Sequence, residues 1–196
     1  IPSINLVSES ITETALAYFE EKQMPVQLMG VDSVFGQLTG IENIITDGHY
    51  EVFDGAFDRA VLGQGLAWKL GIGVHFIHAI EVYAPKREGK VNMLRPDVNF
   101  NSERCFIAGT FAVNQQKYDE NLMLVDIDLA RRLLDYETTE VTALQVGVAE
   151  GYSIRRAKRD IATILGEGYL IQDRYEQQED FFRILRVEKF LTTLLL

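Results

Sequence analysis

The chain has 196 residues, of which 47% are hydrophobic and 24% are charged, a composition typical of a globular protein with a buried core. Its formal net charge of −10 at pH 7 argues against a nucleic-acid-binding protein, because neutralising phosphates requires a basic face. The single cysteine excludes an intrachain disulfide and a thiolate metal cluster, and no run of about 18 apolar residues could form a membrane helix.

The first part of the chain predicts a β-hairpin followed by irregular structure. In residues 14–19 and 26–31, successive side chains would alternate between the two faces of a half-buried strand. A turn at 20–24 separates the two segments. Residues 32–58 contain scattered glycines and predict irregular structure with one short helix near 41–45. We interpret the acids of this stretch as a solvated surface rather than a catalytic site; they are Asp47, Glu51, Asp54 and Asp58.

Residues 59–72 predict a strand, a glycine turn and a short helix. Gly63 and Gly65 follow a short apolar run and permit a tight turn that side chains would block. One face of the following helix carries Leu66, Ala67 and Leu70. Gly71 suits the left-handed residue that commonly follows a helix.

This glycine turn has two possible explanations. It could cradle a phosphate, as in dinucleotide-binding enzymes, or it could be a compact structural corner. Trp68 occupies the place of the third glycine of the dinucleotide fingerprint, while Glu81 lies at a tolerable distance for the ribose-binding acid. Because the match is partial, we favour the structural corner.

The middle of the chain predicts three strands, at residues 74–83, 105–113 and 122–125. Cys105 lies in an apolar alternating run, which favours a buried and inert thiol. His75 and His78 are three residues apart on the first of these strands, so they point to opposite faces and cannot bind one metal ion together. We therefore expect no metal site and no cofactor.

The loop at residues 85–104 is the candidate functional segment. It is locally basic in an acidic protein, with Lys86, Arg87, Lys90, Arg95 and Arg104 against Glu88, Asp97 and Glu103. It also places the apolar residues Val91, Met93 and Leu94 next to Pro96. Long loops between paired strands often carry function, so this segment is either a partner-binding loop or an ordinary surface loop.

The last third of the chain predicts alternating helices and strands. A helix capped by Asp126 runs to Leu134, and a second helix starts at Ser153 and ends before Gly166. The other expected elements are strands at 141–148 and 169–171 and a helix from about Tyr175 to the end. The apolar end at residues 190–196 is either a helix packed on the core or the beginning of a membrane segment.

These elements predict an α+β protein of two lobes. Residues 1–72 and 135–196 would form an α/β lobe assembled from both ends of the chain, and residues 73–134 would form a smaller β-rich inserted lobe.

Several blocks, taken together, resemble one family. The block VLGQGLAWKLGI at residues 61–72 resembles a block of the periplasmic core domain of the MacB and lipoprotein-releasing (FtsX-like) ABC transporter permeases. IAGTF at 107–111, the Tyr118–Asp119 pair and VDIDLARRLL at 125–134 are similar to the next blocks in the same order. Residues 180–196 resemble the stretch that leads into the second membrane helix, where a Glu-Lys pair precedes the apolar span.

The resemblance implies a MacB-type periplasmic core domain with a porter-like α/β lobe and a β-rich lobe. It implies a non-enzymatic domain on the periplasmic side of the bacterial inner membrane, attached by membrane segments outside this chain. The expected partners are a cytoplasmic ATPase subunit and a second permease subunit, with no nucleic acid. In lipoprotein-releasing members, a hook in the β-rich lobe recruits a periplasmic lipoprotein carrier.

The hook corresponds here to the loop at residues 85–104, and its candidate partner-binding residues are Val91, Met93, Leu94, Arg95 and Pro96. The leading hypothesis is therefore a domain that takes part in releasing lipoproteins and passing them to a carrier. The alternatives are a MacB-type efflux, export or mechanotransmission permease and, from another class, a nucleotide-binding α/β enzyme built on Gly63 and Gly65.

Overall fold

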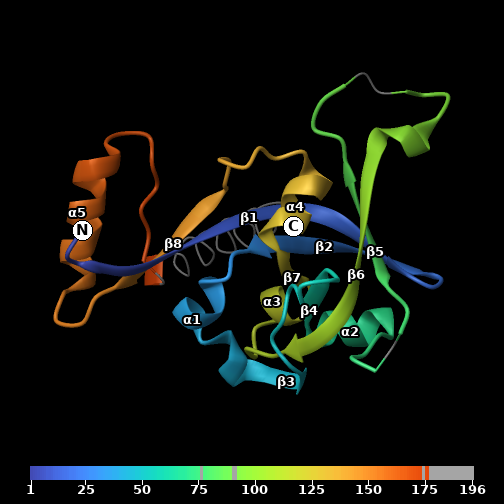
Figure 1. Ribbon diagram of the computed structural model, residues 1–196, viewed down its shortest axis with the longest axis horizontal. Helices are drawn as coiled ribbons and strands as arrows, with labels where there is room; N and C mark the ends of the chain where they lie inside the picture. Colours follow the sequence, from blue (N-terminus) through green and yellow to red (C-terminus); the bar gives the residue numbers. More distant parts are fainter. Residues whose placement is uncertain (76, 90–91, 174, 177–196) are drawn as a thin grey trace, which may run out of the picture. The chain divides into compact units, whose positions relative to one another are not determined.

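The structure, a computed structural model, describes residues 1–75, 77–89, 92–173 and 175–176 (Figure 1). The strands are β1 (Ile4–Phe19), β2 (Lys22–Val31), β3 (Ile45–Gly48), β4 (Arg59–Gly63), β5 (Ile80–Pro85), β6 (Phe100–Phe111), β7 (Leu122–Asp126) and β8 (Ala143–Val148). The α-helices are α1 (Phe35–Thr39), α2 (Gln64–Leu70), α3 (Gln116–Asp119), α4 (Ile127–Leu134) and α5 (Ile154–Leu165), and two 3-10 helices are η1 (Ile41–Ile44) and η2 (Pro96–Asn99).

The β1–β2 hairpin is confirmed, with a tighter turn than the sequence predicts. The two strands pair without a break from Phe19↔Lys22 to Ser10↔Val31. Only two residues connect them, and Glu20 takes the left-handed conformation at φ 54°. Alternation along β1 places Ala15, Ala17 and Phe19 in the core, as the period of a strand requires.

Six strands of the sheet form a closed ring. Their order is β2-β7-β4-β6-β5-β1, and the hairpin pairing of β1 with β2 joins the two ends. The pairs β2–β7 and β4–β6 are parallel, and the other four pairs are antiparallel. β3 pairs with β6 and β8 pairs with β1 outside this ring. Each strand of the ring therefore has a hydrogen-bonded neighbour on both sides.

Helices α2 and α4 pack on the larger of two hydrophobic clusters. The helices contribute Leu66, Leu70, Leu129 and Leu133, which are fully or almost fully buried among apolar side chains of the six ring strands. α4 begins at Asp126, whose side chain accepts a hydrogen bond from the backbone N–H of Asp128 at 2.8 Å, as predicted. α4 packs so closely on β2 that a Cβ at Gly30 would lie 2.3 Å from the Cβ of Ala130.

A second cluster lies around α1 and η1. It joins Phe35 and Ile41 to Val61, Phe111 and Leu124 of the strands, with Tyr50 packed against it. Burial raises the pKa of Tyr50 above its ordinary range, and the nearby carboxylate of Asp32 adds to the rise. The sequence predicts largely irregular structure for residues 32–58, whereas the structure has two short helices, α1 and η1, and strand β3 there.

The chain divides into two compact units, one of residues 7–146 and one of residues 1–6 with 147–196. In the second unit, Ser153 caps α5 by accepting a hydrogen bond from Arg156 N–H, and Gly166 follows the helix, as predicted. Ser3 donates a hydrogen bond of 2.7 Å to Asp160, which ties the first residues of the chain to α5.

These units have other boundaries than the two predicted lobes. β4 belongs to the predicted lobe of residues 1–72 and 135–196, and it pairs with β6 and β7, which belong to the predicted inserted lobe of residues 73–134. The described residues therefore show no break in the sheet near Ile72, and the lobe division stays a prediction.

Three local predictions need correction or fall outside the described residues. Strand β5 begins at Ile80 rather than near Val74, so His75 and His78 lie in a connection and not on a strand. Tyr169–Ile171 does not form a strand. The predicted last helix starts at Tyr175, but its residues from 177 onward lie outside the described part of the chain.

Candidate functional site

The predicted partner-binding loop is the connection between β5 and β6. The strands pair from Ile80↔Cys105 to Pro85↔Phe100, so the ends of the predicted 85–104 segment belong to the sheet and the loop itself spans 86–99. Figure 1 shows this connection extending away from the strands that carry it. The loop therefore presents its middle residues beyond the sheet.

Two asparagines brace the loop from opposite sides. The backbone N–H of Asn92 donates to Oδ1 of Asn99 at 2.8 Å, and Nδ2 of Asn99 donates to the carbonyl oxygen of Asn92 at 3.1 Å. Closer to the sheet, the backbone N–H of Lys86 donates to the carbonyl oxygen of Asn99 at 2.8 Å. The two arms of the loop are thus joined at two levels.

Beyond this brace lies a tight turn that carries most of the candidate residues. Oδ1 of Asn92 accepts hydrogen bonds from the backbone N–H groups of Leu94 and Arg95, both at 3.0 Å. Met93 and Leu94 are 88% and 94% exposed, so two large apolar side chains stand in solvent. We call residues 92–95 the loop tip. An exposed pair of this kind on an ordered turn is suited to insertion into a partner's apolar pocket.

The structure brings three of the five candidate residues together. Met93, Leu94 and Arg95 belong to the loop tip, and Pro96 is the first residue of η2, directly after it. Val91 lies outside the described residues. The sequence analysis missed Asn92 and Asn99; the available signal was the preference of asparagine for turns in which its side chain accepts backbone hydrogen bonds.

The base of the loop is fastened through Arg87. Its guanidinium forms two hydrogen bonds with the carboxylate of Glu140, at 2.6 and 3.1 Å, and lies 4.5 Å from the ring centre of Tyr136. The hydrogen bonds from Arg87 lower the pKa of Glu140. The backbone N–H of Arg87 also donates to Asp135 at 3.2 Å. The loop therefore rests on the segment that follows α4.

The basic character predicted for the segment is partly neutralised. Arg87 is paired with Glu140, and Arg104 contacts Glu81 at 2.5 Å. Glu81 also accepts a hydrogen bond of 2.6 Å from the hydroxyl of Tyr83, which lowers the pKa of this carboxyl. The apolar residues of the tip, rather than a basic surface, are the more distinctive chemical feature of the loop.

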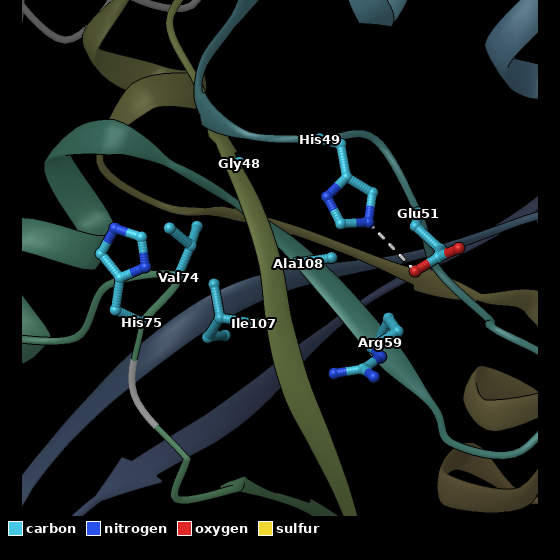
Figure 2. A pocket seen from close by; sticks show the side chains of 8 residues that line it. All are labelled: Gly48, His49, Glu51, Arg59, Val74, His75, Ile107 and Ala108. Carbon is cyan, nitrogen blue, oxygen red and sulfur yellow. Dashed lines mark hydrogen bonds and ion pairs between the residues drawn. The ribbon is translucent and has the colours of Figure 1, made fainter.

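A shallow cavity of about 290 Å³ lies beside β3 and β6 (Figure 2). Figure 2 shows His49 turned toward Glu51, 3.1 Å away, and His75 on the other side of the strand that carries Ile107 and Ala108. Arg59 borders the cavity and is paired with Asp54 at 2.5 Å. Among the described residues, no group of three side chains is arranged to hold a metal ion.

A second shallow cavity, of about 300 Å³, lies on the outer face of the hairpin and its neighbours, lined by Leu16, Tyr18, Gln23, Tyr83 and Phe100. Leu16 and Tyr18 alternate with the buried residues of β1 and are therefore partly exposed. The same alternation in the sequence predicted a strand but not an apolar outer face.

The glycine turn is filled by protein backbone. A Cβ at Gly63 would lie 2.4 Å from the carbonyl oxygen of Asp119 and 2.5 Å from that of Tyr118, and one at Gly65 would lie 3.0 Å from the former. Carbonyl oxygens repel a phosphate, so this turn is a structural corner. Trp68, in the place of the third fingerprint glycine, is 83% exposed on α2.

Cys105 is fully buried, as predicted, and burial raises the pKa of its thiol well above the ordinary range. A buried thiol that stays protonated is a poor nucleophile, so Cys105 acts as a small core residue.

Three solved structures share the fold. The extracellular domain of the ABC-type transporter YknZ from Gram-positive bacteria aligns with a TM-score of 0.56 and 13% identity, covering 84% of this chain and 78% of that chain. The periplasmic region of MacB from Actinobacillus actinomycetemcomitans aligns with a TM-score of 0.57 and 9% identity, covering 83% of this chain and 66% of that chain. A domain provisionally assigned to a permease of Porphyromonas gingivalis aligns with a TM-score of 0.50 and 17% identity, covering 88% of this chain and 68% of that chain.

The expected α+β fold of a MacB-type periplasmic core domain is therefore confirmed. No protein-family model and no curated protein sequence matches the chain. Within the described residues, none of the helices combines the length and the apolar character needed to cross a lipid bilayer.

Proposed function

We propose that this chain is the periplasmic domain of an inner-membrane ABC transporter permease that takes part in releasing lipoproteins and passing them to a periplasmic carrier. The fold shared with the MacB and YknZ domains supports the transporter class. The exposed apolar tip on a braced loop supports the recruitment of a protein partner, and this observation carries the finer part of the proposal.

In this proposal the domain is mechanical and not catalytic. A separate cytoplasmic ATPase subunit hydrolyses ATP, a second permease subunit completes the transporter, and membrane segments outside this chain transmit the movement. Met93 and Leu94 of the loop tip enter an apolar pocket on the carrier, and Arg95 borders the contact; Val91 and Pro96 stay predicted partner-binding residues. Buried apolar anchors with a polar rim are the usual arrangement of a protein interface.

Site-specific photo-crosslinking in the full transporter tests this role. A photoreactive residue at each position from 91 to 96 should capture the lipoprotein carrier, most strongly at Leu94, whose side chain is 94% exposed. The matched control is the same photoreactive residue at Trp68, which is also strongly exposed but lies on α2. Capture of the carrier from Trp68 as readily as from Leu94, or from neither, contradicts the proposal.

The alternative function is that of a MacB-type efflux or export permease, or of a related protein that transmits mechanical movement across the membrane. The likeness to the periplasmic region of MacB favours it. In that case the crosslinks from the loop tip form with another protein or another copy of the transporter, and the lipoprotein carrier is not captured.

A further inference from the structure

The side chains of Asn92 and Asn99 make four hydrogen bonds with the backbone of the loop. Oδ1 of Asn92 accepts from Leu94 N–H and Arg95 N–H at 3.0 Å each. Asn99 accepts from the N–H of Asn92 through Oδ1, at 2.8 Å, and donates to its carbonyl oxygen through Nδ2, at 3.1 Å. Backbone N–H groups only donate and carbonyl oxygens only accept, so these partners fix the orientation of both amides.

Another hydrogen bond reaches the tip from the backbone N–H of Val98, which donates to the carbonyl oxygen of Arg95 at 3.3 Å. Met93 and Leu94 are almost fully exposed and gain no burial from their position. The fastenings through Arg87 and Asn101 lie at the base, where Nδ2 of Asn101 donates to the carbonyl oxygen of Leu133 at 3.1 Å. A protein that binds the tip must otherwise overcome the conformational entropy of a mobile turn.

We propose that Asn92 and Asn99 are positioning residues that hold Met93 and Leu94 ready for a protein partner. The proposal rests on the partner-binding function of the loop tip. Asn99 sets the direction in which the tip leaves the loop, because its side chain forms hydrogen bonds with both the N–H and the carbonyl oxygen of Asn92. Asn92 in turn closes the tip over its own side chain, so the chain is ordered before the partner arrives.

The same substitution, asparagine to aspartate, should have different effects at the two positions. Asn92 uses only its oxygen in the hydrogen bonds described above, so Asn92→Asp keeps both of them and leaves the tip ordered. Asn99 uses its oxygen and its nitrogen, so Asn99→Asp loses one hydrogen bond and places a carboxylate oxygen against the carbonyl oxygen of Asn92. Both variants add the same charge to the same loop, so each is the charge control for the other.

Amide hydrogen exchange of the chain, followed by NMR at Leu94 and Arg95, tests the positioning directly. Asn92→Ala and Asn99→Asp should each raise the exchange rates of these amides by about tenfold, because each loses hydrogen bonds of the tip. Asn92→Asp should leave the rates within about twofold of the wild type. Equal rates in the two aspartate variants, or no change in Asn92→Ala, overturn the proposal.

The consequence for binding is measured in the full transporter, as the yield of the crosslink between a photoreactive residue at position 95, the same in every variant, and a purified lipoprotein carrier. Asn99→Asp should lower the apparent affinity by about tenfold, with the folding stability of the domain unchanged, and Asn92→Asp should bind like the wild type. The double variant Met93→Ser/Leu94→Ser should abolish capture, with the photoreactive residue placed at Arg95. If the double variant still captures the carrier, the proposed function is wrong. If the double variant loses capture but the two aspartate variants bind the carrier equally, only the positioning role is wrong.

Discussion

At the scale of single residues, Asp54 shows how one carboxylate orders a connection. Its Oδ1 accepts the backbone N–H groups of Phe57 and Ala56, at 2.7 and 2.9 Å, and its Oδ2 accepts from Nε of Arg59 at 2.8 Å. These hydrogen bonds, that of Phe57 first, lower the pKa of Asp54 from 3.8 to about 2. The turn before β4 is thereby held in one conformation, and Arg59 is oriented at the edge of the cavity in Figure 2.

The lowered pKa predicts a pH-dependent contribution to stability. Since the folded state binds the proton of Asp54 less tightly than the unfolded state, the contribution is fully present above about pH 4 and is lost as the pH falls toward 2. Asp54→Asn should therefore be less stable than the wild type at neutral pH, and the difference should shrink between pH 4 and pH 2. Urea denaturation at several pH values measures it; a difference that does not change with pH contradicts the assignment.

At the scale of elements, the β4–α2 corner explains why a glycine is required at its joint. Gly63 has an ordinary backbone conformation, with φ −56° and ψ 136°, so it is not needed for a left-handed turn. It is needed because the backbone of α3 passes within 2.4 to 2.7 Å of the place of a Cβ. The two glycines of the turn are thus a consequence of close packing between chain segments.

This packing predicts different effects for two alanine substitutions. Gly63→Ala forces its Cβ into the carbonyl groups of Tyr118 and Asp119, which cannot yield, and should lower the free energy of unfolding by about 1–3 kcal/mol. Gly65→Ala, the matched control, meets contacts of 3.0 Å and gains helix propensity of about 1 kcal/mol, so its net effect should be small. Denaturant titration of both variants measures the order, and a tolerated Gly63→Ala contradicts the packing argument.

At the scale of the whole fold, the unit of residues 7–146 is organised by the closure of its sheet. Residues 16–18 of β1 pair with β2 on one side and with β5 on the other, so one short segment completes the ring. Nucleotide-binding α/β enzymes place their ligand in a crevice at the ends of an open parallel sheet. Here the sheet is closed and only two of the six pairs in the ring are parallel, so it lacks the open parallel arrangement of those enzymes.

The function class can be tested by titrating the chain with NAD, NADP and ATP in a calorimeter. We expect no measurable binding at ligand concentrations up to about 1 mM, because the glycine turn faces carbonyl oxygens instead of free backbone N–H groups. Tight and saturable binding of any of the three would overturn the transporter interpretation and favour the nucleotide-dependent enzyme.

The features that depend on neighbouring residues could be predicted from the sequence. It correctly predicted the β1–β2 hairpin, the cap of α4 by Asp126, the cap of α5 by Ser153 and the corner at Gly63, because alternation, capping and turn chemistry act over a few residues. It failed where a local pattern had no partner to pair with. Residues 74–79 alternate like a strand, yet β5 starts only at Ile80, where its register with Cys105 begins.

The way in which these elements combine depends on contacts between residues that are far apart in the chain. The closure of the ring joins strands far apart in the chain, and the filling of the glycine turn depends on α3, more than fifty residues later. In the loop, the sequence indicated an exposed apolar segment, but not the order of its tip. That order comes from the hydrogen bonds that the side chains of Asn92 and Asn99 make with the backbone of the loop, and no sequence motif specified these pairings.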